Sequence, residues 1–396
     1  MKWLSAGESH GPAMGIILEG LPAGLPLGAA RIDHELHRRQ QGHGRGGRMA
    51  IEQDQVEILA GLRHGLTLGS PLHLLVRNRD HANWAQAMQA EPVDGPGAGV
   101  EVRVPRPGHA DLPGALKYGH RDLRNVLERA SARETVNRVL AGAVALQLLE
   151  PMGICVAGFV HALGGVVAGA RPGFEEDPRE LVRRADASPV RCLDPDAEAE
   201  MIRVIDAAHA AGDTLGGVVE LRATGLPAGL GSHVHWERRL DGRLGAALLS
   251  LPAVKGLELG DAFAQSALGG QAALDPLRPA AGTPPLSRQG NRHGGLDGGM
   301  STGETLWLRL AMKPLSTLRR PLPSVNLTSL EACSAHRERS DVCALPALAV
   351  VAEHVLAWEL ARAVLETFGA DTWEETQHRY ARRDERWERI LGPGTC

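Results

Sequence analysis

Residues 14–25 read MGIILEGLPAGL, and residues 219–230 read VELRATGLPAGL. In both stretches an apolar, strand-like run leads into Gly-Leu-Pro-Ala-Gly-Leu, and a helix-like segment that carries arginines follows. Glycine and proline at fixed positions are typical of a turn. We infer a duplicated strand–turn–helix unit, which predicts a fold with pseudo-twofold character. The alternative is the chance recurrence of a favourable turn.

Outside these two stretches, apolar periodicity predicts the other elements. Apolar residues recur every three to four positions along 122–149 and 345–368, which predicts two long helices, the second closed by Gly369. Shorter helices are predicted at 29–40, 176–184, 197–210 and 237–249, and strands at 14–19, 56–60, 71–76, 154–161, 215–222, 254–259 and 304–312. This mixture indicates an α/β (α+β) protein. Because no clean boundary divides the chain, we expect a single domain over 1–396.

Composition narrows the class of protein. The net charge of −4 disfavours a nucleic-acid-binding domain, which usually carries excess positive charge, and 3% aromatic residues leave few platforms for stacked bases. The five cysteines are odd in number and form no CxxC pair, which favours free thiols in a reducing compartment. Acidic residues interrupt any signal-peptide-like stretch, and the longest apolar run is about half of a membrane span. We therefore expect a cytoplasmic protein.

The segment 38–48, RRQQGHGRGGR, concentrates arginine and glycine. The planar guanidinium suits bidentate contact with phosphate or carboxylate, and glycine lets the backbone approach an anion closely. Residues 42–47 also satisfy Gly-x-Gly-x-x-Gly, but a helix-like run precedes them and a strand-like run follows, which is the wrong context for a dinucleotide fingerprint. We interpret the segment as an anion site, with a solvated basic loop as the alternative.

Two histidines lie in loop-like motifs. GESHG at 7–11 carries His10, and RPGHAD at 106–111 carries His109 just before the first long helix. Imidazole titrates near neutral pH, so His10 is a candidate general acid, with a surface or core histidine without a role as the alternative. RPGHAD predicts a structured loop that presents an Arg–His pair, with an ordinary turn as the alternative. His233 and His235 lack an indicated third ligand, and we expect no metal site.

Three further motifs carry charge. In RASARET, 129–135, Arg129 and Arg133 are four residues apart, which places them on one helix face. The Gly-rich run 294–303, followed by KPLST at 313–317, suits a second anion such as a cofactor phosphate. RERSDVC, 337–343, places Asp341 beside Arg339, where the carboxylate could stay ionised and act as a base. The alternatives are a solvated helix face, ordinary turns and a helix-capping Asp.

The order of the motifs is more specific than any one of them. The chain carries, in sequence, GESHG, RRQQGHGRGGRM, RPGHAD, KYGHRD, ERASARET, GLPAGLGSHVHWERRLD, LPAVKGLELGD, NRHGGLDGGMSTG, MKPLST and RSDVC. In this order they resemble the chorismate synthase family, from about residue 3 to about residue 380.

This resemblance implies the last step of the shikimate pathway, in which 5-enolpyruvylshikimate 3-phosphate loses phosphate and a C6 proton by 1,4-anti elimination to give chorismate. It implies a β-α-β sandwich that assembles as a homotetramer. It also implies a need for reduced FMN without net redox change. The sequence shows no appended oxidoreductase domain, so we expect an external flavin reductant, with NADPH involved only indirectly.

The resemblance also implies roles for individual residues. His10 resembles the general acid that protonates the departing phosphate, His109 the histidine at the reduced flavin, and Asp341 the carboxylate that helps proton removal. The implied substrate-binding residues are Arg39, Arg45, Arg48, Arg106, Arg129 and Arg337. The implied cofactor-binding residues are Arg129, Ala130, Ser131, Pro252, Ala253, Gly298, Lys313, Pro314, Leu315, Ser316, Thr317 and Arg339. A non-catalytic phosphate-ligand or RNA-binding protein that uses the Arg/Gly loop is the alternative.

Overall fold

The computed structural model describes residues 1–46, 52–92, 101–169, 171–281 and 284–392. Its first large sheet is antiparallel and has the order β1-β2-β6-β3. The strands are β1 (Lys2–Ala6), β2 (Ala13–Glu19), β3 (Val56–Ala60) and β6 (Leu72–Arg77). Side chains alternate between the two faces of a strand, so Met14, Ile16 and Leu18 of β2 are buried together on the inner face.

The second large sheet is also antiparallel and has the order β10-β15-β9-β7-β8. Its strands are β7 (Cys155–Leu163), β8 (Val166–Val167), β9 (Gly217–Thr224), β10 (Val254–Leu259) and β15 (Leu306–Met312). The central strand β9 is buried almost continuously from Val219 to Ala223. This burial follows because helices cover both faces of the sheet, α10 (Leu345–Phe368) on one and α5 (Pro178–Ala187) on the other.

The two sheets are built by the same succession of elements. Insertions apart, the first repeat runs β1, β2, α1 (Ala29–Gln40), β3, β6 and α4 (Thr135–Leu149), and the second runs β7, β9, α7 (Leu240–Leu249), β10, β15 and α10. Within each sheet the four strands of the repeat then lie in the same order, first-second-fourth-third. The two GLPAGL stretches share left-handed glycines, with φ of 89° and 83° at Gly20 and Gly24, and 76° and 87° at Gly225 and Gly229. The predicted pseudo-twofold duplication is therefore confirmed.

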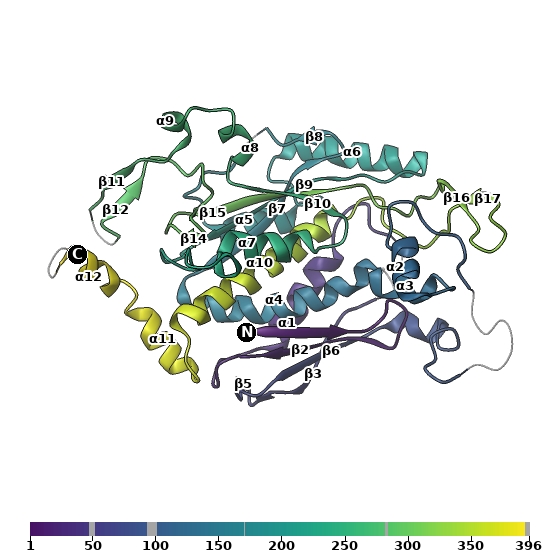
Figure 1. Cartoon of the computed structure of the whole chain (residues 1–396), viewed down its shortest axis with the longest axis horizontal. Helices are drawn as coiled ribbons and strands as arrows, with labels where there is room; N and C mark the ends of the chain where they lie inside the picture. The colour runs from purple at the N-terminus through teal and green to yellow at the C-terminus, as the bar shows by residue number, and fades with distance from the viewer. Residues whose placement is uncertain (47–51, 93–100, 170, 282–283, 393–396) are drawn as a thin grey trace.

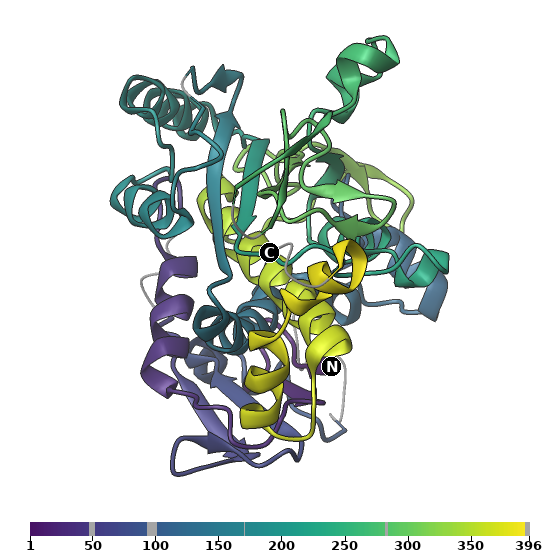
Figure 2. The same ribbon diagram turned by 90° about the vertical axis from the view of Figure 1, so that its left-hand side faces the viewer.

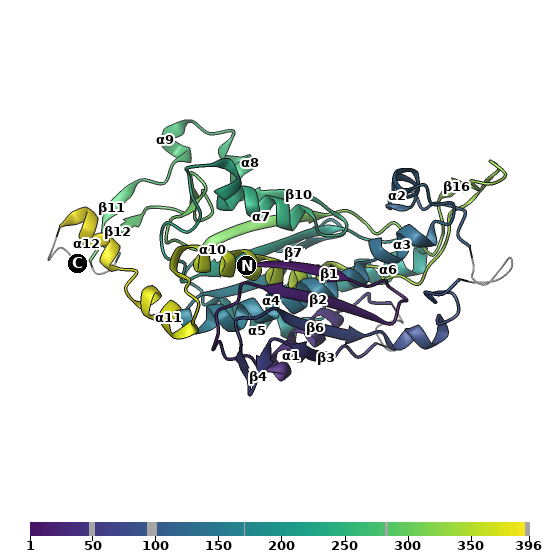
Figure 3. The ribbon, with the colours of Figure 1, turned by 60° about the horizontal axis from the view of Figure 1, so that its bottom comes forward.

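Helices α4 and α10 pack against each other between the two sheets (Figure 1, Figure 3). Their close approach depends on Gly142, where an added Cβ would lie 2.3 Å from the Cβ of His354. One hydrophobic cluster extends from β2 across this helix pair to β9 and β15. The layers are thus sheet, helices, sheet, which confirms the expected β-α-β sandwich.

One predicted helix is wrong. The single helix expected over 122–149 is broken into α3 (Arg124–Ala130), the 3-10 turn η3 (Ala132–Glu134) and α4. The break is at Ser131, whose backbone is extended at ψ 145° and whose hydroxyl accepts a hydrogen bond from the backbone N–H of Arg133. Serine competes with the helical backbone for hydrogen bonds in this way. Arg129 and Arg133 consequently do not share one helix face.

The other predicted elements are confirmed to within a few residues, and α1 and α10 have the predicted bounds. Two details differ. The expected helix at 237–249 begins as η5 (Trp236–Arg238) and continues as α7 after an extended Arg239. Gly369 is the C-cap of α10, as predicted, but its φ of −63° is not left-handed, and an added Cβ would lie 2.3 Å from the carbonyl oxygen of Leu365.

Several elements were not predicted. Besides β1, these are α2 (Asp111–Tyr118), α11 (Trp373–Ala381) and α12 (Glu385–Leu391), the last two at the end of the molecule that faces the viewer in Figure 2. The helix predicted at 197–210 is α6 (Pro195–Ala211). The other elements that were not predicted are α8 (Ala262–Gln265), α9 (Gly270–Ala273), η2 (Arg79–Asn83), η4 (Glu150–Met152), and the hairpins β4 (Leu62–Arg63)–β5 (Leu66–Thr67), β11 (Leu277–Pro279)–β12 (Leu286–Arg288), β13 (Leu296–Asp297)–β14 (Met300–Ser301) and β16 (Pro323–Val325)–β17 (Ala332–Ser334). Among the described helices, none has the length and apolar character that a membrane span requires.

Candidate active site

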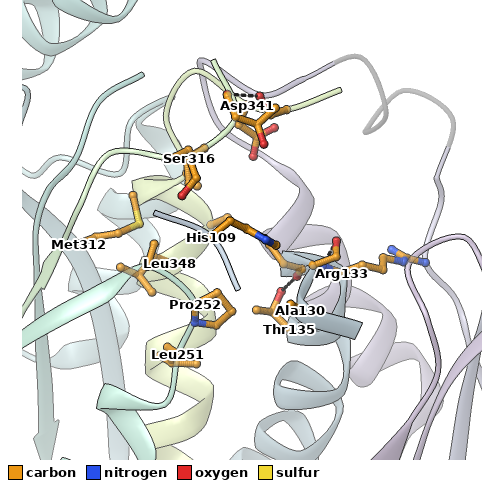
Figure 4. Close-up of a pocket in the computed structure, with 18 of the residues that line it drawn as sticks. His109, Ala130, Arg133, Thr135, Leu251, Pro252, Met312, Ser316, Asp341 and Leu348 are labelled. Atoms are coloured by element: carbon orange, nitrogen blue, oxygen red, sulfur yellow. Dashed lines mark hydrogen bonds between the residues drawn. The ribbon is translucent and has the colours of Figure 1, made fainter. Parts of the chain in front are cut away.

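A cavity of about 610 Å³ lies where the two central helices begin. The first residue of α4, Thr135, lines it together with Ala347, Leu348 and Val351 from the first turns of α10. Figure 4 shows these walls around the side chain of His109. The volume is that of a small-molecule site, and two helix N-termini at one cavity favour an anionic ligand.

Equivalent segments of the two repeats line this cavity with different chemistry. The last turn of α1 contributes the guanidinium group of Arg39, and the segment after α1 contributes that of Arg45. The segment that ends α7 and follows it contributes mainly apolar surface, from Leu249 and from 251–254. The pseudo-twofold relation therefore produces one cationic wall and one apolar wall. Such a cavity can accept a charged molecule and a flat apolar ring together.

The Gly/Arg segment reaches the cavity because it packs tightly on the chain before α10. Gly42 and Gly44 have positive φ of 121° and 81°, and a Cβ on Gly46 would lie 2.9 Å from the carbonyl oxygen of Ser340. Arg45 Nη1 and the backbone N–H of Gly46 each donate to the carboxylate of Asp341 at 2.6 Å. The glycines thus admit a neighbouring segment of the chain. The expected pairing of Asp341 with Arg339 is wrong.

A buried carboxylate joins two of the arginines at the cationic wall. Asp54 has a fully buried side chain and accepts from Arg39 Nη2 at 2.8 Å and from Arg133 Nη1 at 3.0 Å. Burial alone would raise the pKa of Asp54, but the two guanidinium groups outweigh it and lower that pKa. Arg133 also donates from Nε to Asn78 Oδ1 at 2.9 Å. This network holds two cations rigidly at the cavity wall.

His10 is fixed by contacts on several sides. Its backbone N–H and its Nδ1 lie 2.8 Å and 2.9 Å from the carboxylate oxygens of Glu128, and its ring stacks on Trp84 with centroids 4.1 Å apart. Arg124 Nη1 donates to the same carboxylate at 3.0 Å. Burial would raise the pKa of Glu128, but hydrogen bonds and charge from His10, with Arg124, lower it. The buried His10 lines the cavity.

His109 is held in a similar way. Its Nδ1 lies 2.6 Å from Oδ1 of Asp111, the first residue of α2, and the Asp111 side chain is completely buried. Arg106 donates to Asp111 from Nε at 2.8 Å and to Thr317 Oγ1 from Nη1 at 3.1 Å. Burial would raise the pKa of Asp111, but the hydrogen bonds from His109 and Arg106 hold that pKa far below its ordinary range. The ring of His109 is thereby anchored at one edge.

The apolar wall ends in a second group of cations. Lys313 donates from Nζ to Ser316 Oγ at 2.9 Å, and Ser316 donates to the carbonyl of Gly108 at 2.8 Å. Burial, followed by the charge of Lys255, lowers the pKa of Lys313. Ala253 has φ 66°, an unusual conformation for a residue with a Cβ, and such strain is often found at functional sites. Two lysines this close suit a phosphate group.

Comparison with known proteins gives the family. Residues 1–365 match the family model described as chorismate synthase. The chain belongs to the chorismate synthase family. It is 56% identical to the chorismate synthase of Symbiobacterium thermophilum over 381 residues, covering 95% of this chain and 96% of the relative. It is 52% identical to that of Thermus thermophilus over 388 residues, covering 98% of this chain and 99% of the relative.

A solved structure described as a crystal structure of chorismate synthase has a TM-score of 0.79, with 36% identity and 98% coverage of each chain. As a member of the chorismate synthase family, the chain is an enzyme, a lyase of the shikimate pathway. Nothing in these comparisons favours a non-catalytic phosphate-ligand or RNA-binding protein.

Most residues that the chorismate synthase resemblance implied line the one cavity. They are His10, Arg39, Arg45, Arg106, His109, Ala130, Ser131, Pro252, Ala253, Lys313, Leu315, Ser316, Thr317, Arg339 and Asp341. Arg339 reaches it while donating to Asp80 at 2.7 Å. Arg48 lies outside the described residues, and the roles of all these residues stay predictions.

Four implied residues do not line this cavity. Arg129 turns away and donates to Ser5 and to the carbonyl of Gly7. Arg337 is exposed, Pro314 lies beside the wall, and Gly298 is in the turn of the β13–β14 hairpin. The β14 strand of this hairpin packs on α7.

Other side chains at the cavity were not singled out for a role. Arg133 and Lys255 line it as cations, and Glu338 as a carboxylate. Arg133 stood in the RASARET motif with Arg129. The helix breaks between them at Ser131, and only Arg133 lines the cavity. Lys255 stood in LPAVKGLELGD, where a lone lysine gives no signal of its own.

Proposed function

We propose that this chain catalyses the 1,4-anti elimination of phosphate from 5-enolpyruvylshikimate 3-phosphate, giving chorismate, in the presence of reduced FMN and without net redox change. The observation that carries the proposal is the single cavity with one cationic and one apolar wall, into which two carboxylate-held histidines face. The substrate has a phosphate and two carboxylates, and the cofactor has a flat ring and a phosphate. Each wall therefore has a matching ligand.

Reduced FMN fits the residues of the apolar wall. Leu251, Pro252 and Ala253 offer a surface for a ring system, and Lys313 and Lys255 offer charge for the cofactor phosphate. When bound, reduced FMN would supply electron density that weakens the substrate C–O bond and would recover it afterwards. The chain's part is to bind both molecules in a pocket that keeps water away from them.

The cationic wall fits the substrate. Arg39, Arg45 and Arg106 are already fixed by carboxylates or hydroxyls, so little side-chain entropy is lost when they bind an anion. We also propose that Arg48 binds the substrate, on the family resemblance alone. Arg129 and Arg337 stay candidates that would need a rearrangement or another subunit to reach the substrate.

Three side chains are assigned to proton transfer. In the elimination the C–O bond to phosphate breaks, the C6 proton leaves, and a new double bond forms. His10 delivers a proton to the departing phosphate from Nε2, because Glu128 occupies Nδ1. His109 would offer its Nε2 edge to the bound flavin as a hydrogen-bond partner. Asp341, oriented by Arg45 and Gly46, assists removal of the C6 proton as an acceptor.

The test is anaerobic turnover of the enolpyruvyl substrate with chemically reduced FMN. We expect phosphate and chorismate in equal amounts, no reaction without flavin, and no net flavin oxidation. Arg77→Ala removes an exposed arginine that pairs with Glu57 and does not line the cavity, so it serves as a matched control with normal turnover. A folded sample that binds FMN and releases no phosphate would rule out the proposed reaction.

The source of reduced flavin is a separate proposal. We propose that an external reductant supplies it and that NADPH acts only through that reductant. The check is aerobic turnover with NADPH and FMN and no added reductase. Sustained chorismate formation under those conditions would contradict the proposal.

Assembly and location are also proposals. A homotetramer is supported by the exposed cross-strand pair Leu4 and Ile17, 76% and 43% exposed, on the outer face of the first sheet. Light scattering should then give four times the 42.1 kDa of the chain. A single domain over 1–396 is supported by the hydrophobic cluster common to both sheets, and a cytoplasmic location by the free thiols of Cys155, Cys192 and Cys343.

A further inference from the structure

The two histidines at the cavity share one arrangement. Each presents Nδ1 to a buried carboxylate, and each carboxylate also accepts from an arginine. The sets are His109–Asp111–Arg106 and His10–Glu128–Arg124. They come from unrelated segments, a loop before α2 and a loop before β2, so the similarity is not inherited from one local motif.

The contacts of His109 assign its tautomer. A carboxylate oxygen only accepts, so the 2.6 Å contact between Nδ1 and Asp111 Oδ1 requires a proton on Nδ1. Arg106 Nη2 lies 3.0 Å from that nitrogen and also 3.0 Å from Asp111 Oδ1, and its proton goes to the carboxylate because a protonated Nδ1 cannot accept. Nε2 is therefore the nitrogen that changes its protonation.

The same reasoning applies to His10. Its Nδ1 is 2.9 Å and 3.1 Å from the two oxygens of Glu128, so the proton again lies on Nδ1. Glu128 is held by Arg124 and by the backbone N–H of His10, and the ring is held face-on by Trp84 at 4.1 Å. The ring can neither rotate freely nor exchange its tautomer without breaking these bonds.

We propose that Asp111 and Glu128 are positioning residues that keep His109 and His10 in the tautomer whose Nε2 serves the reaction. The proposal rests on the proposed function for its catalytic consequence. A buried carboxylate behind an imidazole fixes ring orientation and stabilises the protonated ring that forms during proton transfer. Each arginine in turn keeps its carboxylate ionised and correctly turned.

The charged groups around each imidazole determine how its protonation should change when the neighbouring carboxylate is removed. His10 faces Glu128 and Arg124 from α3, Glu338 from the segment before α10, and His81, whose ring bonds the His10 carbonyl. His109 faces Asp111 and Arg106 on its own segment, and Lys313 and Lys255 line the same cavity. Loss of either carboxylate removes a negative charge beside the imidazole, which disfavours the protonated ring and so favours the neutral one.

The test compares Asp111→Asn and Glu128→Gln with the parent by two readouts. The first is kcat for anaerobic turnover across pH. The second is the pH dependence of hydrogen–deuterium exchange at the C2 position of each imidazole, read by mass spectrometry, which reports histidine protonation without any need for activity. For Asp111→Asn we expect kcat to fall about 10²- to 10⁴-fold, with the exchange midpoint of His109 lowered and that of His10 unchanged. Glu128→Gln should lower kcat by a similar factor, with the exchange midpoint of His10 lowered and that of His109 unchanged.

The control is Asp206→Asn, which removes the exposed partner of His43 at 2.7 Å and should change neither kcat nor the midpoints of His10 and His109. If one of the two carboxylate variants does not fold, the other variant alone tests the proposal. Lost turnover with an unchanged midpoint for the partnered histidine would show only structural damage and would overturn the proposal, as would turnover within about threefold of the parent. Shifted midpoints in a chain that never turns over would support positioning and refute the proposed function instead.

Discussion

Replacement of Asp54 by Asn tests the charge network at the cationic wall. In the parent, the buried carboxylate of Asp54 pairs with both Arg39 and Arg133, which line the cavity, and Glu52 lies 3.7 Å from Arg133. Removal of one partner from a buried ion pair costs about 3–5 kcal/mol, because the remaining charges stay buried. Asparagine keeps the shape and one acceptor oxygen, so we expect about 3 kcal/mol for Asp54→Asn, the lower end of that range.

This loss translates into a measurable shift in melting temperature. An unfolding entropy of about 2.1 cal/mol/K per residue gives a chain of 396 residues about 0.8 kcal/mol/K, so Tm should fall by roughly 4 °C. Thermal unfolding followed by intrinsic fluorescence is the assay. Inorganic phosphate should restore part of the loss, because Arg39 and Arg133 lie at the cavity wall and would then need a counter-ion. Glu57→Gln, in an exposed pair with Arg77, is the control and should not shift Tm.

The direction of the Asp54 pKa shift determines how the contribution of Asp54 to stability changes with pH. The pKa of Asp54 is lowered in the folded chain, so its contribution to stability is complete above the unfolded value of about 3.9 and is lost as pH falls through the folded pKa. The Tm difference between parent and variant should be constant above that value and shrink below it. An unchanged Tm at neutral pH, or phosphate that protects both proteins equally, would refute this account of the wall.

The remaining predictions concern proton transfer and the helix pair. His10→Ala and His109→Ala should each lower kcat about 10²-fold or more, as measured by anaerobic phosphate release on folded protein, and near-normal kcat in either variant would remove its role. Gly142→Ala should destabilise the chain by about 1–3 kcal/mol or more in urea unfolding, because the new Cβ would meet the Cβ of His354 at 2.3 Å. Gly269→Ala, with nothing within 4 Å of the added Cβ, is its control and should be neutral.

Periodicity in the sequence was sufficient to predict most of the fold. Helix α10 is apolar in nearly every turn and α1 is amphipathic, and both were predicted with their observed bounds. The repeated GLPAGL turn predicted the duplication because its left-handed glycines are required at the same positions in both copies. The break at Ser131 was missed, since the apolar stripe continues across it and only a side-chain-to-backbone hydrogen bond interrupts the helix.

Residue types at the site could be predicted, but their partners could not. The Gly/Arg segment indicated close backbone approach, yet the neighbour that Gly46 admits, Ser340, is far away in sequence. In the same way Asp341 pairs with Arg45, although Arg339 is closer along the chain. Contacts of this kind depend on how the two repeats pack together, which no local pattern encodes.

The most direct test of the central claim is a crystal structure of the chain with FMN and the enolpyruvyl substrate bound. The account predicts both ligands in the cavity between the starts of α4 and α10, in contact with each other, with the flavin on the wall of Pro252 and the substrate phosphate on the arginine wall. His10 Nε2 should lie about 3 Å from a phosphate oxygen, and His109 Nε2 within the same reach of the flavin. Either ligand bound outside this cavity, or an imidazole beyond hydrogen-bond reach of both, would contradict the account.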